Sequence, residues 1–163
     1  MLRNPQCGLR TLLEIGDLAR ALNDMIETIA ESEAKFRQLA ENISDVFMIV
    51  EIGPPTRFLY VSPAYDTVWG QNPARVYENA AAWLEIAHPD DVPQLVASWR
   101  TLGSTPTTTE SRIVRHDGAV RWVRTRTFPM VDEVGRPMRV VGVATDVTER
   151  RQAEEALRQQ TRE

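Results

Sequence analysis

Three β-rich runs joined by two short turns restrict the fold of this sequence more than any other feature. Residues 107–115 and 120–131 are rich in β-branched and aromatic side chains, and Asp117-Gly118 stands between them. An Asp-Gly pair between two such runs is the strongest short-range signal of a β-hairpin. A second turn at residues 132–137 leads into a third run at residues 138–147. The sequence therefore predicts a three-stranded antiparallel meander.

Two further strands and a set of short helices precede the meander. Residues 46–51 and 57–61 have the composition of strands. Short helices are expected over residues 62–85 and a longer one over residues 89–102, because a polar residue precedes a proline at three helix starts: Ser62-Pro63, Asn72-Pro73 and His88-Pro89. A proline suits the first turn, where its missing N–H has no partner. This order predicts an α+β fold, a five-stranded antiparallel sheet with short helices on one face.

A seven-residue repeat marks the N-terminal quarter of the sequence. Between residues 15 and 43, two positions of each heptad are apolar, with Ser32 as the exception: Ile15, Leu18, Leu22, Met25, Ile29, Phe36, Leu39 and Ile43. We expect an irregular lead over residues 1–14 and a long amphipathic helix over residues 15–44. A narrow apolar seam is typical of a coiled coil that pairs with a second copy of the chain. The alternative is an ordinary amphipathic helix that covers its own domain.

Residues 148–163 form a last helix of low apolar content. Thr148 can cap its start, and Glu154 and Arg158 make a favourable i, i+4 pair. A helix this polar is marginal by itself in water, and no stop signal follows it. We expect it to be the beginning of a longer helix that is attached to a core of residues 45–147.

The composition restricts the partners and the compartment of the protein. The 163 residues carry a net charge of −4, which gives no general attraction to nucleic acids or anionic membranes. No apolar run reaches the about 18 residues of a membrane-spanning helix, and the N-terminus lacks the pattern of a secretory signal. Cys7 is the only cysteine, so no internal disulfide can form. We therefore expect a cytoplasmic protein.

Six motifs within residues 33–150 resemble a PAS domain with its C-terminal companion, the PAC motif. In chain order they are FRQLAEN with DVF (36–47), YVSPAY with WG (60–70), HPDD (88–91), HDG (116–118), RWV (121–123) and GVATDVTER (142–150). The resemblance implies a sheet in the strand order 2-1-5-4-3 and a pocket between sheet and helices. It also implies a regulatory role in a bacterial signalling protein, such as a two-component system with a histidine kinase, a diguanylate cyclase or a chemoreceptor as output.

The resemblance assigns the relay of the signal to Asp146 and Thr148. These residues would bond back to the sheet, through an arginine or the Asp117-Gly118 turn, and fix the direction of the last helix. The alternative is that Asp146 only ends a strand and Thr148 only caps a helix. The two interpretations overlap, because a cap that fixes a helix start also fixes its direction.

Large side chains of the middle segment are candidates for the walls of a ligand pocket: Met48, Tyr60, Tyr65, Trp69, Trp83 and Trp99. The alternative is that they fill a small core, as most large aromatic side chains do. The sequence names no ligand and no cofactor. The reaction of flavin with cysteine that light-sensing relatives use is excluded, because no cysteine follows Cys7.

No residue pattern indicates a metal, a haem or a catalytic centre. His88 stands at a helix start, where capping explains it, and His116 stands beside a tight turn. With Cys7, these histidines lack metal-binding spacing. The sequence also contains no nucleophile elbow, phosphate-binding loop or H-E-x-x-H motif.

Five arginines make the central hairpin basic: Arg112, Arg115, Arg121, Arg124 and Arg126. We expect them to pair with acidic residues of the flanking helices or to be solvated, and not to bind an anionic ligand.

These features together predict a homodimeric sensory module without enzymatic activity of its own. It would relay a conformational change through its flanking helices to a covalently attached output domain, with a small molecule as the ligand of its pocket. Two alternatives stay open: a ligand-free dimerisation platform, and a small α+β enzyme with a buried acid–base pair.

Overall fold

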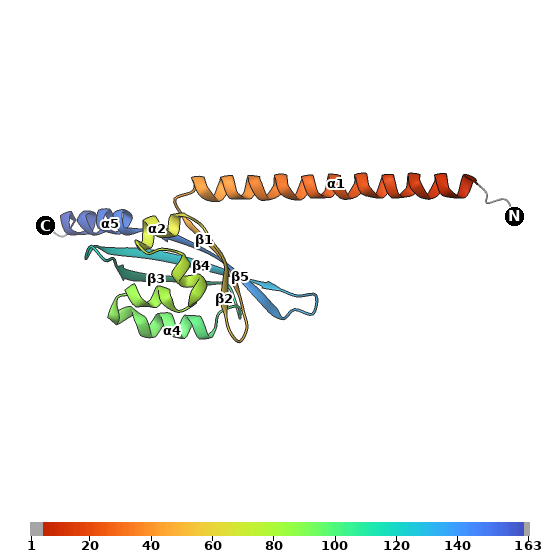
Figure 1. The fold of residues 1–163 in the computed structure, drawn as a ribbon. Coiled ribbons are helices and arrows are strands. Elements are labelled where there is room, and N and C mark those ends of the chain that lie inside the picture. Colours follow the sequence, from red (N-terminus) through yellow and green to blue (C-terminus); the bar gives the residue numbers. More distant parts are fainter. Residues whose placement is uncertain (1–4, 162–163) are drawn as a thin grey trace. The chain divides into compact units, whose positions relative to one another are not determined.

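The structure, a computed structural model, describes the backbone of residues 5–161 and the side chains of residues 17–39 and 43–161 (Figure 1). The chain divides into two units, Met1–Leu39 and Ala40–Glu163. The first unit contains most of the helix α1 (Pro5–Asn42), and the second contains a sheet, several short helices and the helix α5 (Thr148–Gln160). Each unit is described by itself.

Helix α1 begins well before the predicted start at Ile15. The irregular lead predicted over residues 1–14 is corrected from Pro5 onward, and residues 1–4 lie outside the described part of the chain. Proline is compatible with a first helical turn, and Gly8 destabilises a helix by only about 1 kcal/mol relative to alanine. The many good helix formers that follow Gly8 outweigh this cost.

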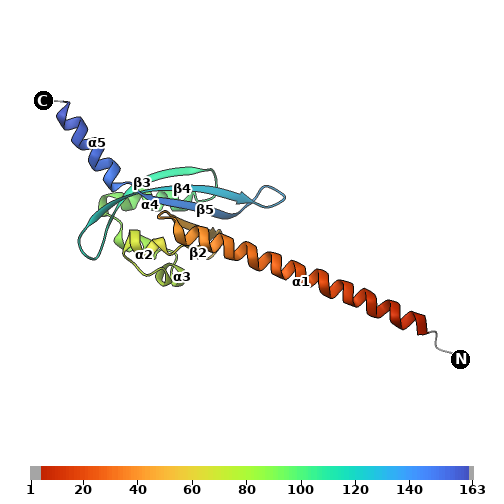
Figure 2. The same cartoon turned by 90° about the horizontal axis from the view of Figure 1, so that it is seen from above.

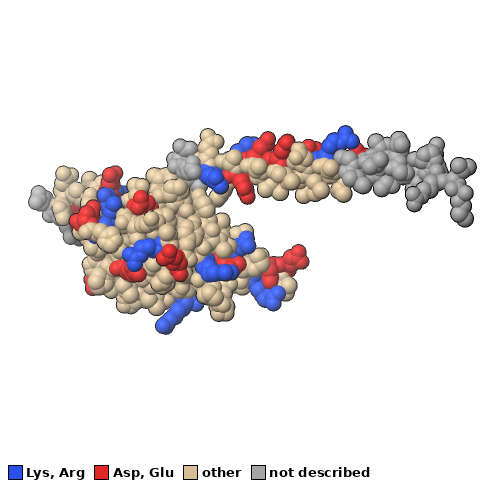
Figure 3. Space-filling model, viewed as in Figure 1, with Lys and Arg blue, Asp and Glu red and all other residues tan. Residues whose placement is uncertain are grey.

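The predicted seam of α1 is exposed to solvent within its own unit. The seam side chains that the structure describes are each about half exposed or more: Leu18, Leu22, Met25, Ile29, Phe36 and Leu39. The side chain of Ile15 lies outside the described part. Figure 3 shows uncharged side chains along one edge of α1 and most of its charged side chains along the other. No helix among residues 5–161 combines the length and the hydropathy that a membrane crossing requires.

The five predicted strands form one antiparallel sheet. They are β1 (Val46–Glu51), β2 (Arg57–Val61), β3 (Thr107–Val114), β4 (Val120–Val131) and β5 (Pro137–Asp146). Their order in the sheet is β2-β1-β5-β4-β3. The predicted α+β class and the strand order that the resemblance implied are therefore confirmed.

Both turns of the meander hold a glycine in the left-handed region, where other residues are strained. The φ angles are 79° at Gly118 and 83° at Gly135. An aspartate stabilises each turn through its side chain, as when Asp117 Oδ1 accepts a hydrogen bond from the backbone N–H of Ala119 at 2.9 Å. Asp132 has the same role in the second turn. In each turn, the aspartate carboxylate accepts hydrogen bonds from backbone N–H groups, and the glycine adopts the positive φ angle that the turn requires.

The short helices follow β2 in the chain and cover one face of the sheet (Figures 1 and 2). They are α2 (Ala64–Trp69), α3 (Ala74–Glu78), the 3-10 helices η1 (Ala82–Ile86) and η2 (Pro89–Asp91), and α4 (Val92–Arg100). The helix predicted over residues 89–102 therefore begins with a 3-10 turn.

Two of the three predicted helix starts are capped by the residue before the proline. Asn72 Oδ1 accepts from the N–H of Ala74 at 2.9 Å, and His88 Nδ1 accepts from the N–H of Asp90 at 3.3 Å. Ser62 is different, because its hydroxyl accepts from the N–H of a strand residue, Phe47, at 3.0 Å. Ser62 therefore extends the pairing of the sheet and does not cap α2.

Alternate residues of the strands form the core against the helices. Val46 and Val50 of β1, Val123 of β4, and Val140 and Ala144 of β5 are each at most 2% exposed. Side chains of successive residues point to opposite faces of a strand, so the residues between them face away from the helices. This alternation determines which strand residues line the space between the sheet and the helices.

Segment His88–Asp91 covers the free edge of β3. The N–H of His88 donates to the carbonyl of Arg112 at 2.9 Å, and Asp91 Oδ2 accepts from the N–H of Arg112 at 2.7 Å. An uncovered edge strand exposes unpaired N–H and C=O groups that invite pairing with another chain. The helix layer and β3 are therefore joined by specific hydrogen bonds as well as by packing.

We predict that Gly70→Ala lowers the free energy of unfolding by about 1–2 kcal/mol. Gly70 ends α2 with a φ of 65°, and a Cβ atom there would lie 2.8 Å from Arg115 Nε. Gly53→Ala is the control, because its Cβ would meet only the carbonyl of Pro55, at 3.9 Å. Urea unfolding measures both, and equal losses in the two variants would contradict the prediction.

Candidate functional site

A cavity of about 90 Å³ lies between the inner face of the sheet and the short helices. All five strands contribute to its walls, as do the segments from α2 to α4. Of the six predicted pocket residues, five line it: Met48, Tyr65, Trp69, Trp83 and Trp99. Whether these side chains contact a ligand stays a prediction.

Tyr60 is not among the residues that line the cavity. A bulge between β1 and β2 pairs Ile49 with Tyr60 and Val50 with Phe58, which leaves Leu59 as an extra residue. Ile49 lies on the face of the sheet opposite to Val50, and its partner Tyr60 shares that outer face. The bulge thus changes which side chains of β2 face the helices. The prediction that Tyr60 lines the pocket is therefore wrong.

Aromatic rings form the helix side of the cavity. Tyr65 and Trp69 stack with centroids 5.0 Å apart, and Trp83 lies 5.6 Å from Trp99. The hydroxyl of Tyr65 donates to Gln71 Oε1 at 2.8 Å, and burial raises the pKa of Tyr65 above its ordinary value.

The indole N–H groups of Trp69 and Trp83 are buried and have no acceptor within the described part of the chain. A buried donor without a partner costs about 1–3 kcal/mol. Both tryptophans line the cavity. The packing around the cavity is therefore not optimised for stability alone.

A row of hydroxyl groups on β3 and β4 forms part of the sheet side of the cavity. Thr107, Thr109 and Ser111 of β3 and Thr125 and Thr127 of β4 all line it. No sequence motif predicted this row of hydroxyls. The i, i+2, i+4 spacing in β3 continues to the buried Ile113 and was a usable signal, because residues at that spacing share one face of a strand.

Asp146 and Thr148 meet where β5 passes into α5. Asp146 Oδ1 accepts hydrogen bonds from the N–H and the hydroxyl of Thr148, at 2.9 and 2.5 Å. The hydroxyl of Thr148 in turn accepts from the N–H of Trp122 at 2.8 Å. Asp146 Oδ2 also lies 3.6 Å from Arg121 Nη1. The start of α5 is thus tied to β4 by a side-chain hydroxyl and by an ion pair.

At this junction one expectation is wrong, and one of two alternative expectations is found. Thr148 is the first residue of α5 and not its N-cap, and Asp146 provides the side-chain bond to the helix N–H. Among residues 43–161, the Asp117-Gly118 turn bonds only within its own hairpin and takes no part in the junction. An arginine, Arg121, contacts the aspartate instead.

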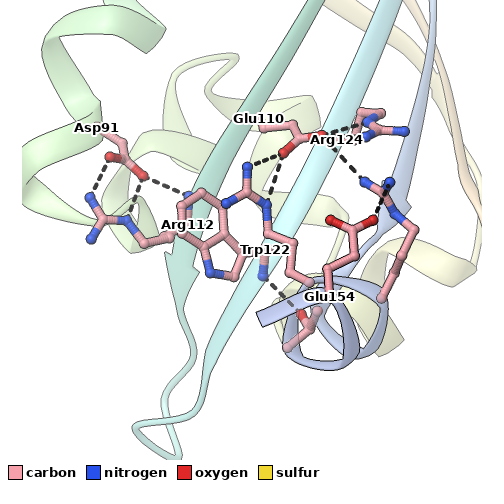
Figure 4. Close-up of polar contacts among 9 residues, drawn as sticks. Asp91, Glu110, Arg112, Trp122, Arg124 and Glu154 are labelled. Atoms are coloured by element: carbon pink, nitrogen blue, oxygen red, sulfur yellow. Dashed lines mark hydrogen bonds and ion pairs between the residues drawn. The ribbon is translucent and has the colours of Figure 1, made fainter. Parts of the chain in front are cut away.

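A second group at the junction centres on Glu110, which no sequence motif marked (Figure 4). Its carboxylate accepts from Arg124 Nε at 2.6 Å and from Arg151 Nε at 2.9 Å, with a further close contact to Arg151 Nη2. Arg150 Nη2 lies 3.6 Å away. The hydrogen bonds from Arg151 and Arg124 hold the pKa of Glu110 below its usual value. We call Glu110, Arg124 and Arg151 the Glu110 clamp.

Trp122 lies beside the clamp and connects it to the helix layer. The guanidinium of Arg151 lies 3.9 Å from the centroid of the Trp122 ring, and that of Arg112 lies 5.4 Å from it. Arg112 also donates from Nε and Nη2 to the two oxygens of Asp91, at 3.1 and 2.7 Å. These hydrogen bonds hold the pKa of Asp91 below its usual value. The expected pairing of hairpin arginines with acidic residues of the flanking helices is thus found for Arg112.

A family model described as the PAS fold matches residues 58–144, more than half of the chain. The chain belongs to the PAS family. Among curated proteins, the uncharacterized protein y4lL of Sinorhizobium fredii (strain NBRC 101917 / NGR234) is 29% identical over 136 residues. The match covers 80% of this PAS chain but only 16% of that relative.

Solved structures with a similar fold include domains of sensory proteins. A domain assigned to a light and redox sensing histidine kinase of Haloarcula marismortui is 25% identical, with a TM-score of 0.57 over 71% of this chain and 99% of that one. The N-terminal domain of a diguanylate cyclase with a PAS/PAC sensor, from Marinobacter aquaeolei, has a TM-score of 0.58 at 17% identity, over 66% and 98%. The second likeness shows the fold alone.

The cavity of this PAS domain offers no cysteine for covalent flavin chemistry and no histidine for haem ligation. Its lining residues include neither cysteine nor histidine. His88 caps η2, and His116 is exposed beside its turn. In the part of the chain that the structure describes, no three His, Cys, Asp or Glu side chains gather as metal ligands. The side chain of Cys7 lies outside that part.

We predict that Glu110→Gln lowers the free energy of unfolding at pH 7 by about 1–2 kcal/mol, because the charged clamp becomes a neutral hydrogen bond. The folded pKa of Glu110 lies below the ordinary value of 4.5. The clamp therefore stabilises the fold above pH 4.5, and this contribution disappears as the pH falls through the folded pKa. The difference between wild type and variant should shrink over that range.

Urea unfolding at several pH values measures this difference. Glu133→Gln is the control, since Glu133 is exposed in the second turn and should change stability by less than about 0.5 kcal/mol. A difference between wild type and Glu110→Gln that is the same at pH 7 and at pH 3 would contradict the assignment.

Proposed function

We propose that this PAS domain is the sensory module of a larger signalling protein, and that it acts by binding and conformational relay and not by catalysis. Membership of the PAS family and the likeness to a domain of a histidine kinase support the sensory role. We propose a kinase or a cyclase as the attached output domain, and the cytoplasm as the compartment. The lack of a second cysteine is compatible with that compartment.

One observation carries the relay: a single segment of β3 touches both the cavity and α5. Thr109 and Ser111 line the cavity, and Glu110 between them binds Arg151 of α5 on the other face of the sheet. Consecutive residues of a strand are rigidly linked and point to opposite faces. A ligand that displaces Thr109 or Ser111 therefore also displaces the carboxylate that holds α5.

A relay also needs two arrangements of the moving part, and α5 offers an alternative partner for Glu110. Arg150 lies 3.6 Å from Glu110, and it also donates to Glu154 within α5 at 3.1 Å. A small rotation of α5 would replace Arg151 by Arg150 at Glu110. A change in the direction of α5 would then be transmitted to the proposed output domain.

We predict that Arg151→Gln makes the amides of the first turns of α5 exchange with solvent about tenfold faster, because the helix loses its charged contact with β3. Arg158→Gln is the control, since Arg158 lies in the last turn of the same helix. Asp146→Ala should resemble Arg151→Gln, with the sheet amides unchanged. Hydrogen exchange read out by mass spectrometry measures all three. Equal exchange in Arg151→Gln and Arg158→Gln would contradict the relay.

We further propose that the seam of α1 pairs two copies of the chain. The exposed apolar side chains of α1 recur at heptad spacing, which favours a coiled coil. Dimerisation would place two copies of α5 in one assembly, where a change in their direction can act on a shared output domain. A ligand-free platform would need this pairing too, and the relay through β3 distinguishes the sensory module from it.

We predict that the chain is a dimer at ~100 µM and that Ile29→Glu makes it a monomer, because a charge in an apolar seam loses its hydration. Ala34→Glu introduces the same side chain outside the seam and should leave the dimer intact. Light scattering measures the mass of each variant. A monomeric wild type, or equal masses for both variants, would contradict the pairing.

A further inference from the structure

The walls of the cavity carry no formal charge. None of the residues that line it is Asp, Glu, Lys, Arg or His. Glu110, which stands between two lining residues of β3, lies on the other face of the strand with its arginine partners. An ion that enters such a cavity gives up its hydration and meets no counter-charge, at a cost of several kcal/mol. The cavity therefore disfavours carboxylates and cations alike.

The sheet wall nevertheless has hydrogen-bonding capacity to spare. On this wall, the hydroxyls of Thr107 and Thr127 bond to each other at 2.6 Å. Within residues 43–161, the hydroxyls of Thr109, Ser111 and Thr125 make no hydrogen bond to another protein group.

Strand residues that face a core are usually apolar, and threonine is more often exposed than buried. Thr109 and Thr125 are cross-strand partners, so they lie opposite each other on the same face. Each hydroxyl can donate one hydrogen bond and accept others. The hydroxyls of this wall therefore offer hydrogen-bond donors and acceptors to a molecule in the cavity.

The helix wall is apolar and contains the part that can yield. Leu95, Trp83 and Trp99 contribute to it. Tyr65 and Trp69 are buried, whereas Trp83 and Trp99 are half-buried. A cavity that holds benzene has a volume of about 150 Å³, which exceeds the about 90 Å³ found here. A ring-sized ligand therefore enters only if the Trp83–Trp99 pair moves.

We propose that the cavity binds a neutral, mostly apolar small molecule that carries a hydrogen-bonding group, and that it rejects charged molecules of the same shape. The apolar part packs against Trp83 and Trp99, and the polar group bonds to the hydroxyls of Thr109 and Thr125. This inference rests on the proposed sensory function and names the chemistry of its signal. Because its polar group bonds to Thr109, the ligand also acts on the β3 segment that holds Glu110.

Four probes of one shape test the proposal: benzamide, benzoate, benzamidinium and ethylbenzene. All have a single ring with a short substituent, and they differ in charge and in hydrogen bonding. Titration of the purified chain at pH 7, followed by tryptophan fluorescence and by saturation-transfer NMR, gives four dissociation constants. We expect benzamide to bind at least about tenfold more tightly than either ion, and ethylbenzene to bind more weakly than benzamide.

Isosteric variants locate the hydrogen bonds. Thr109→Val and Thr125→Val keep the shape of the wall and should each weaken benzamide by about five- to tenfold, with ethylbenzene bound as tightly as before or more tightly. Thr108→Val is the matched control, because Thr108 is exposed on the other face of the same strand.

Three results would overturn the proposal. They are an ion that binds as tightly as benzamide, a Thr109→Val variant that binds benzamide as Thr108→Val does, and no binding of any probe at low millimolar concentration. None of these results changes the exchange of α5 in Arg151→Gln. A failure of the ligand chemistry and a failure of the relay are therefore distinguishable.

Discussion

The carboxylate of Glu110 accepts hydrogen bonds from Arg124 on β4 and from Arg151 on α5, at the place where the last helix leaves the sheet. A carboxylate that is partly removed from water needs such partners, because desolvation alone would raise its pKa and favour its neutral form. The arginine hydrogen bonds outweigh the desolvation, and the pKa is lowered instead. The Glu110 clamp therefore ties the first turn of α5 to β3.

The opposite face of the same strand shows why this connection matters. Its hydroxyls line a cavity of about 90 Å³, and two buried indole N–H groups nearby have no acceptor in the described part of the chain. Stability falls by about 24 cal/mol for each Å³ of cavity, so a cavity of this size lowers the free energy of unfolding by about 2 kcal/mol. A filled, apolar core would be more stable. Departures from optimal packing that gather at one place are typical of functional sites.

The architecture could be predicted from the sequence because each signal was local. The Asp117-Gly118 turn and the β-branched runs beside it define β3 and β4 by their composition alone. The prolines after Asn72 and His88 mark helix starts in the same way. Five of the six predicted pocket residues line the cavity because large side chains of a sheet-and-helix core converge there.

What the sequence did not reveal depends on pairing across the chain. Tyr60 faces away from the cavity because of the bulge at Leu59, and a bulge is visible only once the partner strand is known. Half of the Glu110 clamp could have been predicted from the sequence, because counting outward from the Asp117-Gly118 turn places Glu110 opposite Arg124. The other half was not, because Arg151 is 41 residues away and its position depends on the direction in which α5 leaves the sheet.

The central claim is that the cavity and α5 are mechanically coupled through β3. The side-chain Nε–H resonance of Arg151 reports its bond to Glu110 directly, and Thr109→Ile fills part of the cavity from the other face of the strand. The account predicts that this substitution shifts the Arg151 resonance, while the resonance of Arg136, which binds Asp132 in the second turn, stays in place. An unchanged Arg151 resonance, in a variant whose cavity-lining methyl groups do shift, would contradict the coupling.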